Sequence, residues 1–154
     1  MELEKIKTLL YRIEKLMYGY NYEVTLGIEI FEGCSNISLV NKSIKRLFPD
    51  SNPEQIEPTI VLESSFWQVI NETFDYRGES PGVALILNKQ QELTLLDKQH
   101  EYKTYLSQFI NQQTRIYDYK FLEGIPGYPV FWDYAFVIVT DDEKCILIYG
   151  SSSD

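Results

Sequence analysis

Apolar residues near the carboxyl end of the chain fall into two short runs, residues 133–140 and 145–149, with a polar tetrapeptide between them. Each run is too short for a typical helix and is rich in β-branched and aromatic residues, which favours strands. A gap of about four residues suits a hairpin. Both alternating sets of positions in the first run are apolar, so we expect that strand to be covered on both faces and to lie centrally in its sheet.

The first third of the chain predicts a helix, a strand and a second helix. Apolar positions recur at three- and four-residue steps over residues 3–20, which indicates a helix that docks on the sheet. Residues 23–31 alternate with a period of two, as a strand does. Ser35 is a suitable N-cap for the second helix, which Pro49 ends.

Helical periodicity returns twice in the rest of the chain. Residues 59–74 fit a helix with Thr59 as its cap, and residues 98–112 fit another. Residues 114–122 alternate and predict a strand, from which a loop rich in glycine and proline leads to the hairpin.

One stretch between these helices is ambiguous. Ser80 and Pro81 resemble the cap and first position of a helix. The apolar residues 83–87 also suit a buried strand that pairs with residues 92–96 as a hairpin. The sequence favours the strands slightly. At the end of the chain we expect residues 151–154 to fray.

These elements predict one α+β domain over residues 1–154. Its antiparallel sheet carries helices mainly on one face and has the C-terminal β-hairpin at its centre. A chain of 154 residues suits a single core. The lack of a regular strand–helix alternation with glycine-rich turns weighs against a doubly wound nucleotide-binding fold.

The charge of the chain is strongly negative and unevenly distributed. The formal net charge is -9, and residues 47–82 carry one arginine against seven carboxylates. This composition argues against nucleic-acid binding through a basic surface. An acidic surface keeps a small protein soluble, and it also speeds encounter with a basic partner. Solubility alone is the simpler interpretation.

The start of the chain and its two cysteines indicate the cellular compartment of the protein. The first residues lack the basic region and long apolar core of a secretory signal. No apolar run approaches the roughly 18 residues that a membrane span needs. We therefore predict a cytoplasmic protein, no membrane partner, and reduced thiols at Cys34 and Cys145.

Candidate catalytic residues are few. His100 is the only histidine, which excludes a site with several histidine ligands, and its neighbour Glu101 would point about 100 degrees away on a helix. Cys145 lies in an apolar run, and no nearby histidine supports Cys34 as a nucleophile. The sequence holds no nucleotide-binding, zinc-protease or nucleophile-elbow motif. It predicts no catalytic residue, metal or cofactor, and leans away from an enzyme.

Two groups of carboxylates are candidates for binding. Asp133 stands between two aromatic residues at the start of the central strand, where burial would raise its pKa. The ordinary alternative is an aspartate that bonds to loop amides. Asp141, Asp142 and Glu143 occupy the hairpin turn. Three consecutive carboxylates diverge, so we expect a solvated turn there rather than a calcium loop.

Aromatic residues supply the other candidates. The segment 124–132 has glycines and prolines that limit its freedom, so its aromatic side chains can be presented at a low entropic cost. Such residues dominate binding hot spots, although closing one end of the core is an equally good role for them. The candidate binding residues are Tyr117, Tyr119, Tyr128, Trp132, Asp133, Asp141, Asp142 and Glu143.

Three functional hypotheses follow. The first is a non-catalytic, acidic protein-binding domain, for example an inhibitor or immunity protein whose carboxylates imitate phosphates and occlude a basic nuclease toxin. The second is a small enzyme or ligand-binding domain with a site near Asp133, Asp118 and neighbouring tyrosines. The third is a self-associating protein that forms a homo-oligomer through an edge strand or the first helix.

Overall fold

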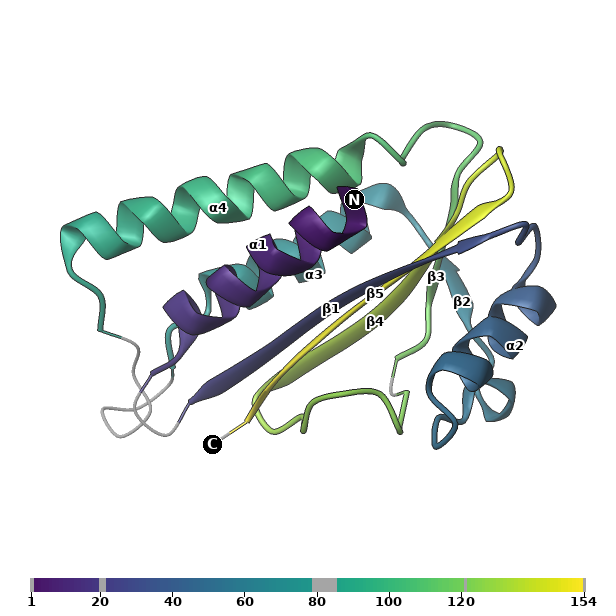
Figure 1. Cartoon of the computed structure of the whole chain (residues 1–154), viewed down its shortest axis with the longest axis horizontal. Coiled ribbons are helices and arrows are strands. Elements are labelled where there is room, and N and C mark those ends of the chain that lie inside the picture. Colours follow the sequence, from purple (N-terminus) through teal and green to yellow (C-terminus); the bar gives the residue numbers. More distant parts are fainter. Residues whose placement is uncertain (1, 20–21, 79–85, 121, 154) are drawn as a thin grey trace.

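The chain folds into a five-stranded antiparallel sheet with helices on both of its faces (Figure 1). The computed structural model describes residues 2–19, 22–78, 86–120 and 122–153. The sheet has the strand order β1-β5-β4-β3-β2. These strands are β1 (Glu23–Glu32), β2 (Thr59–Val61), β3 (Arg115–Asp118), β4 (Trp132–Val139) and β5 (Lys144–Ser153). The predicted α+β class, with an antiparallel sheet, is confirmed.

The C-terminal hairpin β4–β5 forms the middle of this sheet, as the sequence predicts. Its turn is closed by the Thr140 amide, which donates to the Lys144 carbonyl at 2.9 Å. Alternate side chains of β4 enter two separate hydrophobic clusters, one on each side of the sheet. Phe136 and Ile138 belong to one cluster, and Val137 and Val139 to the other. The apolar character of both sets of positions is thereby explained.

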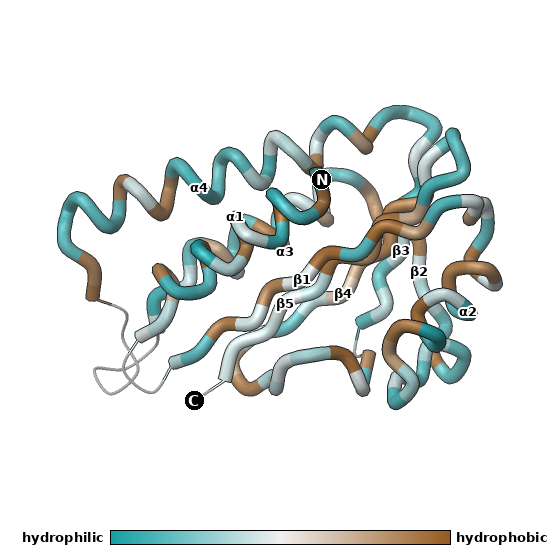
Figure 2. The backbone as a smooth tube through the Cα atoms, viewed as in Figure 1, coloured by the Kyte–Doolittle hydropathy of each residue, from teal (hydrophilic) through white to brown (hydrophobic). Residues whose placement is uncertain are grey.

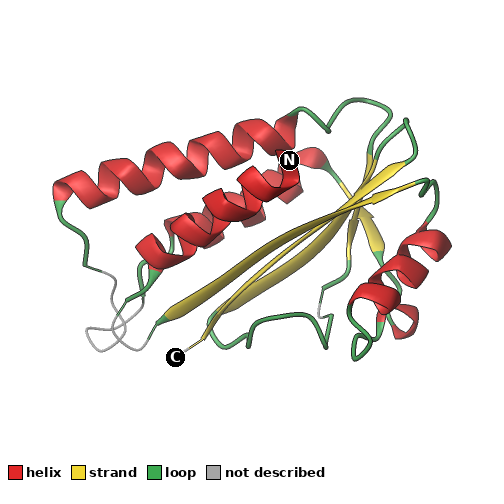
Figure 3. Ribbon diagram, viewed as in Figure 1, coloured by secondary structure: helices red, strands yellow, loops and turns green. Residues whose placement is uncertain are grey.

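Three helices cover one side of the sheet, which we call the helix face. They are α1 (Glu2–Met17), α3 (Glu63–Asp75) and α4 (Lys89–Ser107). Figure 3 shows that they lie on the same side, with α4 outermost, and Figure 2 shows that α4 is mostly hydrophilic. The apolar stripe of α1 is buried against the strands, which fits its helical periodicity. No helix in the described part of the chain is long and apolar enough to cross a membrane.

The opposite side, the strap face, is covered by the one α-helix α2 (Ile37–Leu47), which the short 3-10 helix η1 (Pro53–Gln55) contacts, and by residues 122–130, which we call the strap. In Figure 1 both lie below the sheet, with α2 at one end. Asn36 caps α2, because its side chain accepts a hydrogen bond from the Leu39 amide at 3.1 Å. The cap expected from the sequence, Ser35, lies one residue too early.

Two predictions in the middle of the chain are wrong. Residues 59–61 form the edge strand β2 and pair with β3, and the helix begins only at Glu63. Residues 92–96 are helical, inside α4. Asn88 and Gln91 form a capping box that starts this helix, and the signal was readable in the sequence. Most of the alternative strand at 83–87 lies outside the described residues.

Three predicted boundaries also shift. Residues 151–153 continue β5 instead of fraying, because they pair with the first residues of β1 and with β4. The strand predicted over residues 114–122 ends at Asp118, whose carboxylate accepts a hydrogen bond from the Lys120 amide at 2.6 Å. Lys120 has a positive φ of 55°, so the chain turns away from the sheet there. The helix predicted over residues 98–112 ends at Ser107.

Candidate functional site

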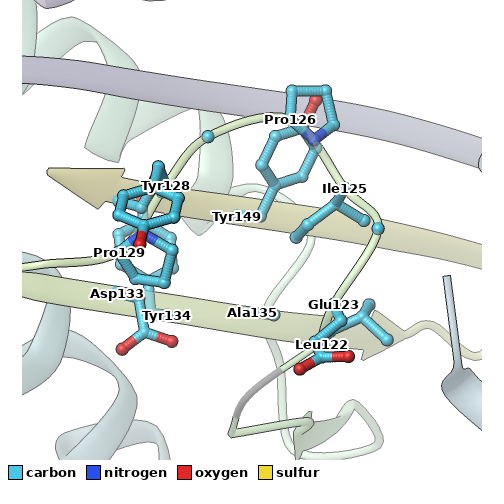
Figure 4. A pocket seen from close by; sticks show the side chains of 14 residues that line it. Leu122, Glu123, Ile125, Pro126, Tyr128, Pro129, Asp133, Tyr134, Ala135 and Tyr149 are labelled. Carbon is cyan, nitrogen blue, oxygen red and sulfur yellow. The ribbon is translucent and has the colours of Figure 1, made fainter. Parts of the chain in front are cut away.

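The strap encloses a pocket against β4 and β5 on the strap face (Figure 4). Its volume is about 360 Å³. Ala135 and Tyr149, both buried, form the floor, and residues 122–129 form the wall and roof. The pocket exists because α2 covers only one end of this face, and an irregular segment bridges the remainder.

Hydrogen bonds hold both ends of the strap. At its start, the Glu123 amide donates to Oδ1 of Asn52 at 3.2 Å. At its end, the amides of Val130 and Phe131 donate to the Ser152 carbonyl at 2.7 and 3.2 Å. Ser152 belongs to β5, so the strap is fixed to the sheet itself. A segment anchored at both ends loses little entropy when a partner binds.

Two glycines let the strap lie directly on its neighbours. Gly127 has φ +113°, and a Cβ atom there would stand 2.2 Å from Oγ of Ser151. Gly124 has φ +85°, and its Cβ would stand 2.3 Å from the Asp50 carbonyl. Both positions require a residue without a side chain, for conformational and for steric reasons. The two glycines therefore allow the chain to turn and also to lie in close contact with Ser151 and with the Asp50 carbonyl.

The rim of the pocket is acidic. Figure 4 shows the exposed carboxylates of Asp133 and Glu123 at opposite ends of the rim. Asp133 also lines an adjoining hollow of about 290 Å³ with Asp118 and Lys120. Partial burial, and secondarily the charge of Asp118, raise the pKa of Asp133. In the described part of the chain no lysine or arginine forms an ion pair with any of these three carboxylates.

Apolar side chains stand beside this acidic rim. Tyr128 is 73 % exposed and Val130 is 47 % exposed, and Figure 4 shows Tyr128 next to Pro129 on the Asp133 side of the pocket. An exposed aromatic ring held on a fixed segment suits contact with another molecule. The site thus combines an apolar recess, an exposed tyrosine and carboxylates that form no ion pair with the described residues.

The other predicted aromatic residues have structural contacts. Trp132 is half-buried toward the helix face, where its Nε1 donates to the Tyr22 hydroxyl at 2.8 Å. Tyr119 is fully buried, and its hydroxyl donates to Oδ1 of Asn41 on α2. Tyr117 lies half-buried on β3 and packs on the cluster beneath α2. The pocket therefore brings together Tyr128 and Asp133 from the predicted set, and not these three.

The turn carboxylates lie at the far end of the hairpin. Asp141, Asp142 and Glu143 are exposed between β4 and β5, separated from Asp133 by the length of β4, or about 25 Å. A hydrogen bond from the Thr140 hydroxyl lowers the pKa of Asp142, with a smaller contribution from Lys144. The turn and the pocket are consequently two separate acidic regions.

No described histidine or cysteine lines the pocket beside Asp133. His100 and Glu101 are exposed on α4, across the sheet from the pocket. Burial raises the pKa of the Cys145 thiol, whose Sγ donates to the Cys34 carbonyl at 3.1 Å. Both thiols are buried and free. Within the described residues no cluster of three or more histidine, cysteine or acidic side chains could hold a metal ion.

The free edge of β1 is partly occupied by side chains of α1. The Leu26 amide donates to Oε1 of Glu14 at 2.7 Å, and Nζ of Lys7 lies 2.8 Å from Oε1 of Glu29. Such contacts satisfy or shield edge groups that would otherwise pair with another strand.

The sequence indicated the segment 124–132, which contains Gly127, by its dense glycine and proline spacing. It did not indicate Glu123 or Tyr149 as parts of the site. The floor position of Tyr149 depends on strand register, in which Tyr149 pairs with Ala135 on one side and with Gly27 on the other. Its ring lies over Gly27, where a Cβ atom would stand 1.9 Å from the ring.

Comparison with known proteins yields a structural likeness. No protein-family model and no curated protein sequence matches this chain. A crystal structure of citrus MAF1 in space group P3₁21 resembles it with a TM-score of 0.58 at 12 % identity, over 95 % of this chain and 97 % of that one. A second citrus MAF1 structure, in space group C222₁, gives 0.57 at 11 % identity, over 94 % and 98 %. At this level of identity the likeness shows that the two chains share a fold.

Proposed function

We propose that this chain is a non-catalytic protein-binding domain that holds a basic partner against its strap face. The observation that carries the proposal is the strap pocket, where Asp133 and Glu123 stand at the rim of an apolar recess and Asp118 lines the adjoining hollow. None of these three carboxylates forms an ion pair among the described residues. A basic partner would supply the missing cations.

The physical requirements of a binding surface support this choice. The strap is fixed at both ends, so little order has to be gained on binding. Tyr128 offers an exposed aromatic anchor next to the recess. The net charge of -9 steers a basic protein toward the domain and repels an acidic one.

A narrower version makes the domain an inhibitor of a basic nuclease toxin, with its carboxylates in the places of nucleic-acid phosphates. The charge and the size of the domain support this version, and its test is protection of nucleic acid by the domain in a nuclease assay.

A second candidate function is a small-ligand-binding domain or enzyme at Asp133. The pocket volume favours it, because ligand sites begin at about 300 Å³.

A peptide-display selection on the intact chain tests the main proposal. We expect the enriched peptides to be rich in lysine and arginine, since they must neutralise the rim. Their binding should shift the backbone NMR signals of Gly127, Ala135 and Ser151 more than those of α4. Enriched peptides without basic residues, or shifts confined to the helix face, would contradict the proposal.

Two exposed tyrosines give a matched control for this selection. Tyr128 on the strap is 73 % exposed, and Tyr11 on α1 is 58 % exposed. Tyr128→Ala should weaken binding of a selected peptide by about tenfold, whereas Tyr11→Ala should leave it within about twofold. Equal losses in the two variants would show that the peptide recognises general surface properties instead of the strap.

A further inference from the structure

We propose that the strap pocket receives the side chain of one arginine or lysine of the partner, with its methylene stem on the pocket floor and its charged head at Asp133. This inference rests on the proposed function, because it names the group that a basic partner inserts. The proposed occupant of the pocket is a single long cationic side chain.

The interior of the pocket suits an aliphatic stem. The floor consists of Ala135 and the ring of Tyr149, and Ile125 and Pro126 line the wall and roof. Arginine and lysine regularly bury their methylene stems on apolar surface while the charged head reaches polar groups. A volume of about 360 Å³ accommodates one such side chain with space for water at the open rim.

The Asp133 end of the pocket suits the charged head. Asp133 connects the pocket with the hollow that contains Asp118, so two carboxylates face the same small space. Neither has an ion-pair partner in the described part of the chain, although Lys120 lines the hollow. Tyr128 stands on this side of the pocket and can place its ring against a cation. An incoming head would therefore find the Asp133 carboxylate as its acceptor and the ring of Tyr128 beside it, with the negative charge of Asp118 in the adjoining hollow.

Other kinds of side chain fit less well. An acidic group would meet Asp133 at one end of the rim and Glu123 at the other. A purely apolar group would further desolvate Asp133 without compensating its charge, which costs free energy. The arrangement thus selects for a side chain that is apolar along its length and cationic at its tip.

Four capped tripeptides test this inference by NMR titration of the intact chain. Each carries arginine, lysine, citrulline or norleucine between two glycines. Citrulline keeps the shape of arginine without its charge, and norleucine keeps the stem of lysine without its ammonium group. The arginine and lysine peptides should shift the amides of Ala135, Ser151 and Gly127, with affinities at least about fivefold higher than those of their neutral partners.

Two variants separate charge from shape. Asp133→Asn should reduce the affinity of the arginine peptide by about fivefold and leave that of the citrulline peptide unchanged. Gly127→Ala keeps every carboxylate but forces the strap away from Ser151, so it should weaken both peptides. The unbound variants must first give the strand NMR signals of the parent chain.

The outcomes distinguish this inference from the proposed function. Equal binding of the norleucine and lysine peptides, or no shift at the pocket with any peptide, overturns the inference. If display-selected basic peptides still bind, but their shifts lie on the strap surface outside the pocket, the proposed function stands and the single-side-chain pocket is refuted. If selection enriches no basic peptide, the proposed function itself fails.

Discussion

The two faces of the sheet are closed in different ways. On the helix face, three helices bury a continuous cluster that includes Phe66, Phe136 and Ile138. On the strap face, one helix covers a smaller cluster, and an irregular strap bridges the rest and leaves a pocket. Regular helices interdigitate with strand side chains and leave few voids, whereas a backbone strap rich in glycine and proline cannot. The helix face thus holds the larger part of the hydrophobic core, and the strap face holds the recess that we propose to bind the partner.

The largest expected effect lies on the helix face. Phe136 is almost fully buried, with its ring centroid 5.0 Å from that of Phe66 in an edge-on arrangement. Phe136→Ala removes this contact and leaves a cavity, so we expect a loss of about 3–5 kcal/mol in the free energy of unfolding. Equilibrium urea denaturation measures it. A loss below about 1 kcal/mol would show that this face is not the main core.

The second effect concerns the strap. Gly127→Ala places a methyl group 2.2 Å from Oγ of Ser151 at a positive φ, and we expect a cost of about 1–3 kcal/mol. Hydrogen exchange should report it as faster exchange at Val130 and Phe131. The double variant with Ser151→Ala removes the obstructing hydroxyl and should recover part of the cost. Faster exchange across α1 instead would mean that the two faces are not independent.

A smaller effect tests how α2 is held. Tyr119→Phe removes the hydroxyl that donates to Asn41 and leaves the Asn41 amide oxygen without that hydrogen bond. We expect a loss of about 1 kcal/mol in the free energy of unfolding. Because α2 ends before the strap pocket, peptide binding should not change. Weaker peptide binding by this variant would connect α2 to the site.

The smallest expected effect, at Asp133, is a gain in the free energy of unfolding and not a loss. Burial and Asp118 raise the pKa of Asp133, so the folded pKa lies above the unfolded value. The contribution of this group to stability is then fully present below about pH 4 and is lost as the pH rises through the folded pKa. In the Asp133→Asn variant the neutral amide does not ionise, so the stability of the chain does not fall as the pH rises through the pKa of Asp133. The variant should be slightly more stable than the parent chain at neutral pH and equal to it in acid.

Thermal unfolding between pH 3 and pH 7, at about one-unit steps, measures this difference. Asp141→Asn in the hairpin turn is the control, since it removes one exposed negative charge about 25 Å away. If Asp133→Asn is less stable than the parent chain at neutral pH, the carboxylate has a structural role inside the chain. Such a result would remove the contrast between a stabilising face and a binding face.

Elements that depend on local interactions were predictable from the sequence, and features that depend on long-range contacts were not. Local periodicity predicted α1, β1 and the β4–β5 hairpin, because each buries its own apolar positions. It failed at Thr59, where pairing with β3 outweighs helical propensity, and at residues 92–96, where the capping box of Asn88 was overlooked. Asp133 and Tyr128 could be proposed from their neighbours in sequence.

The rest of the pocket depended on tertiary structure. Tyr149 reaches the floor through the register of three strands, and Asn52 anchors the strap from 71 positions away. Gly124 rests on the Asp50 carbonyl, a contact between two loops. No local pattern encodes such pairings, so the sequence could suggest an aromatic loop but not the recess beneath it.

One comparison of affinities tests the central claim most directly. Two double variants remove the same amount of charge from two separate regions: Asp133→Asn with Glu123→Gln at the pocket, and Asp141→Asn with Asp142→Asn in the hairpin turn. Calorimetric titration with one display-selected basic peptide measures both. We predict a loss of about tenfold or more for the pocket pair and less than about twofold for the turn pair. Equal losses would contradict the claim, because they would show that net charge, and not the strap pocket, attracts the partner.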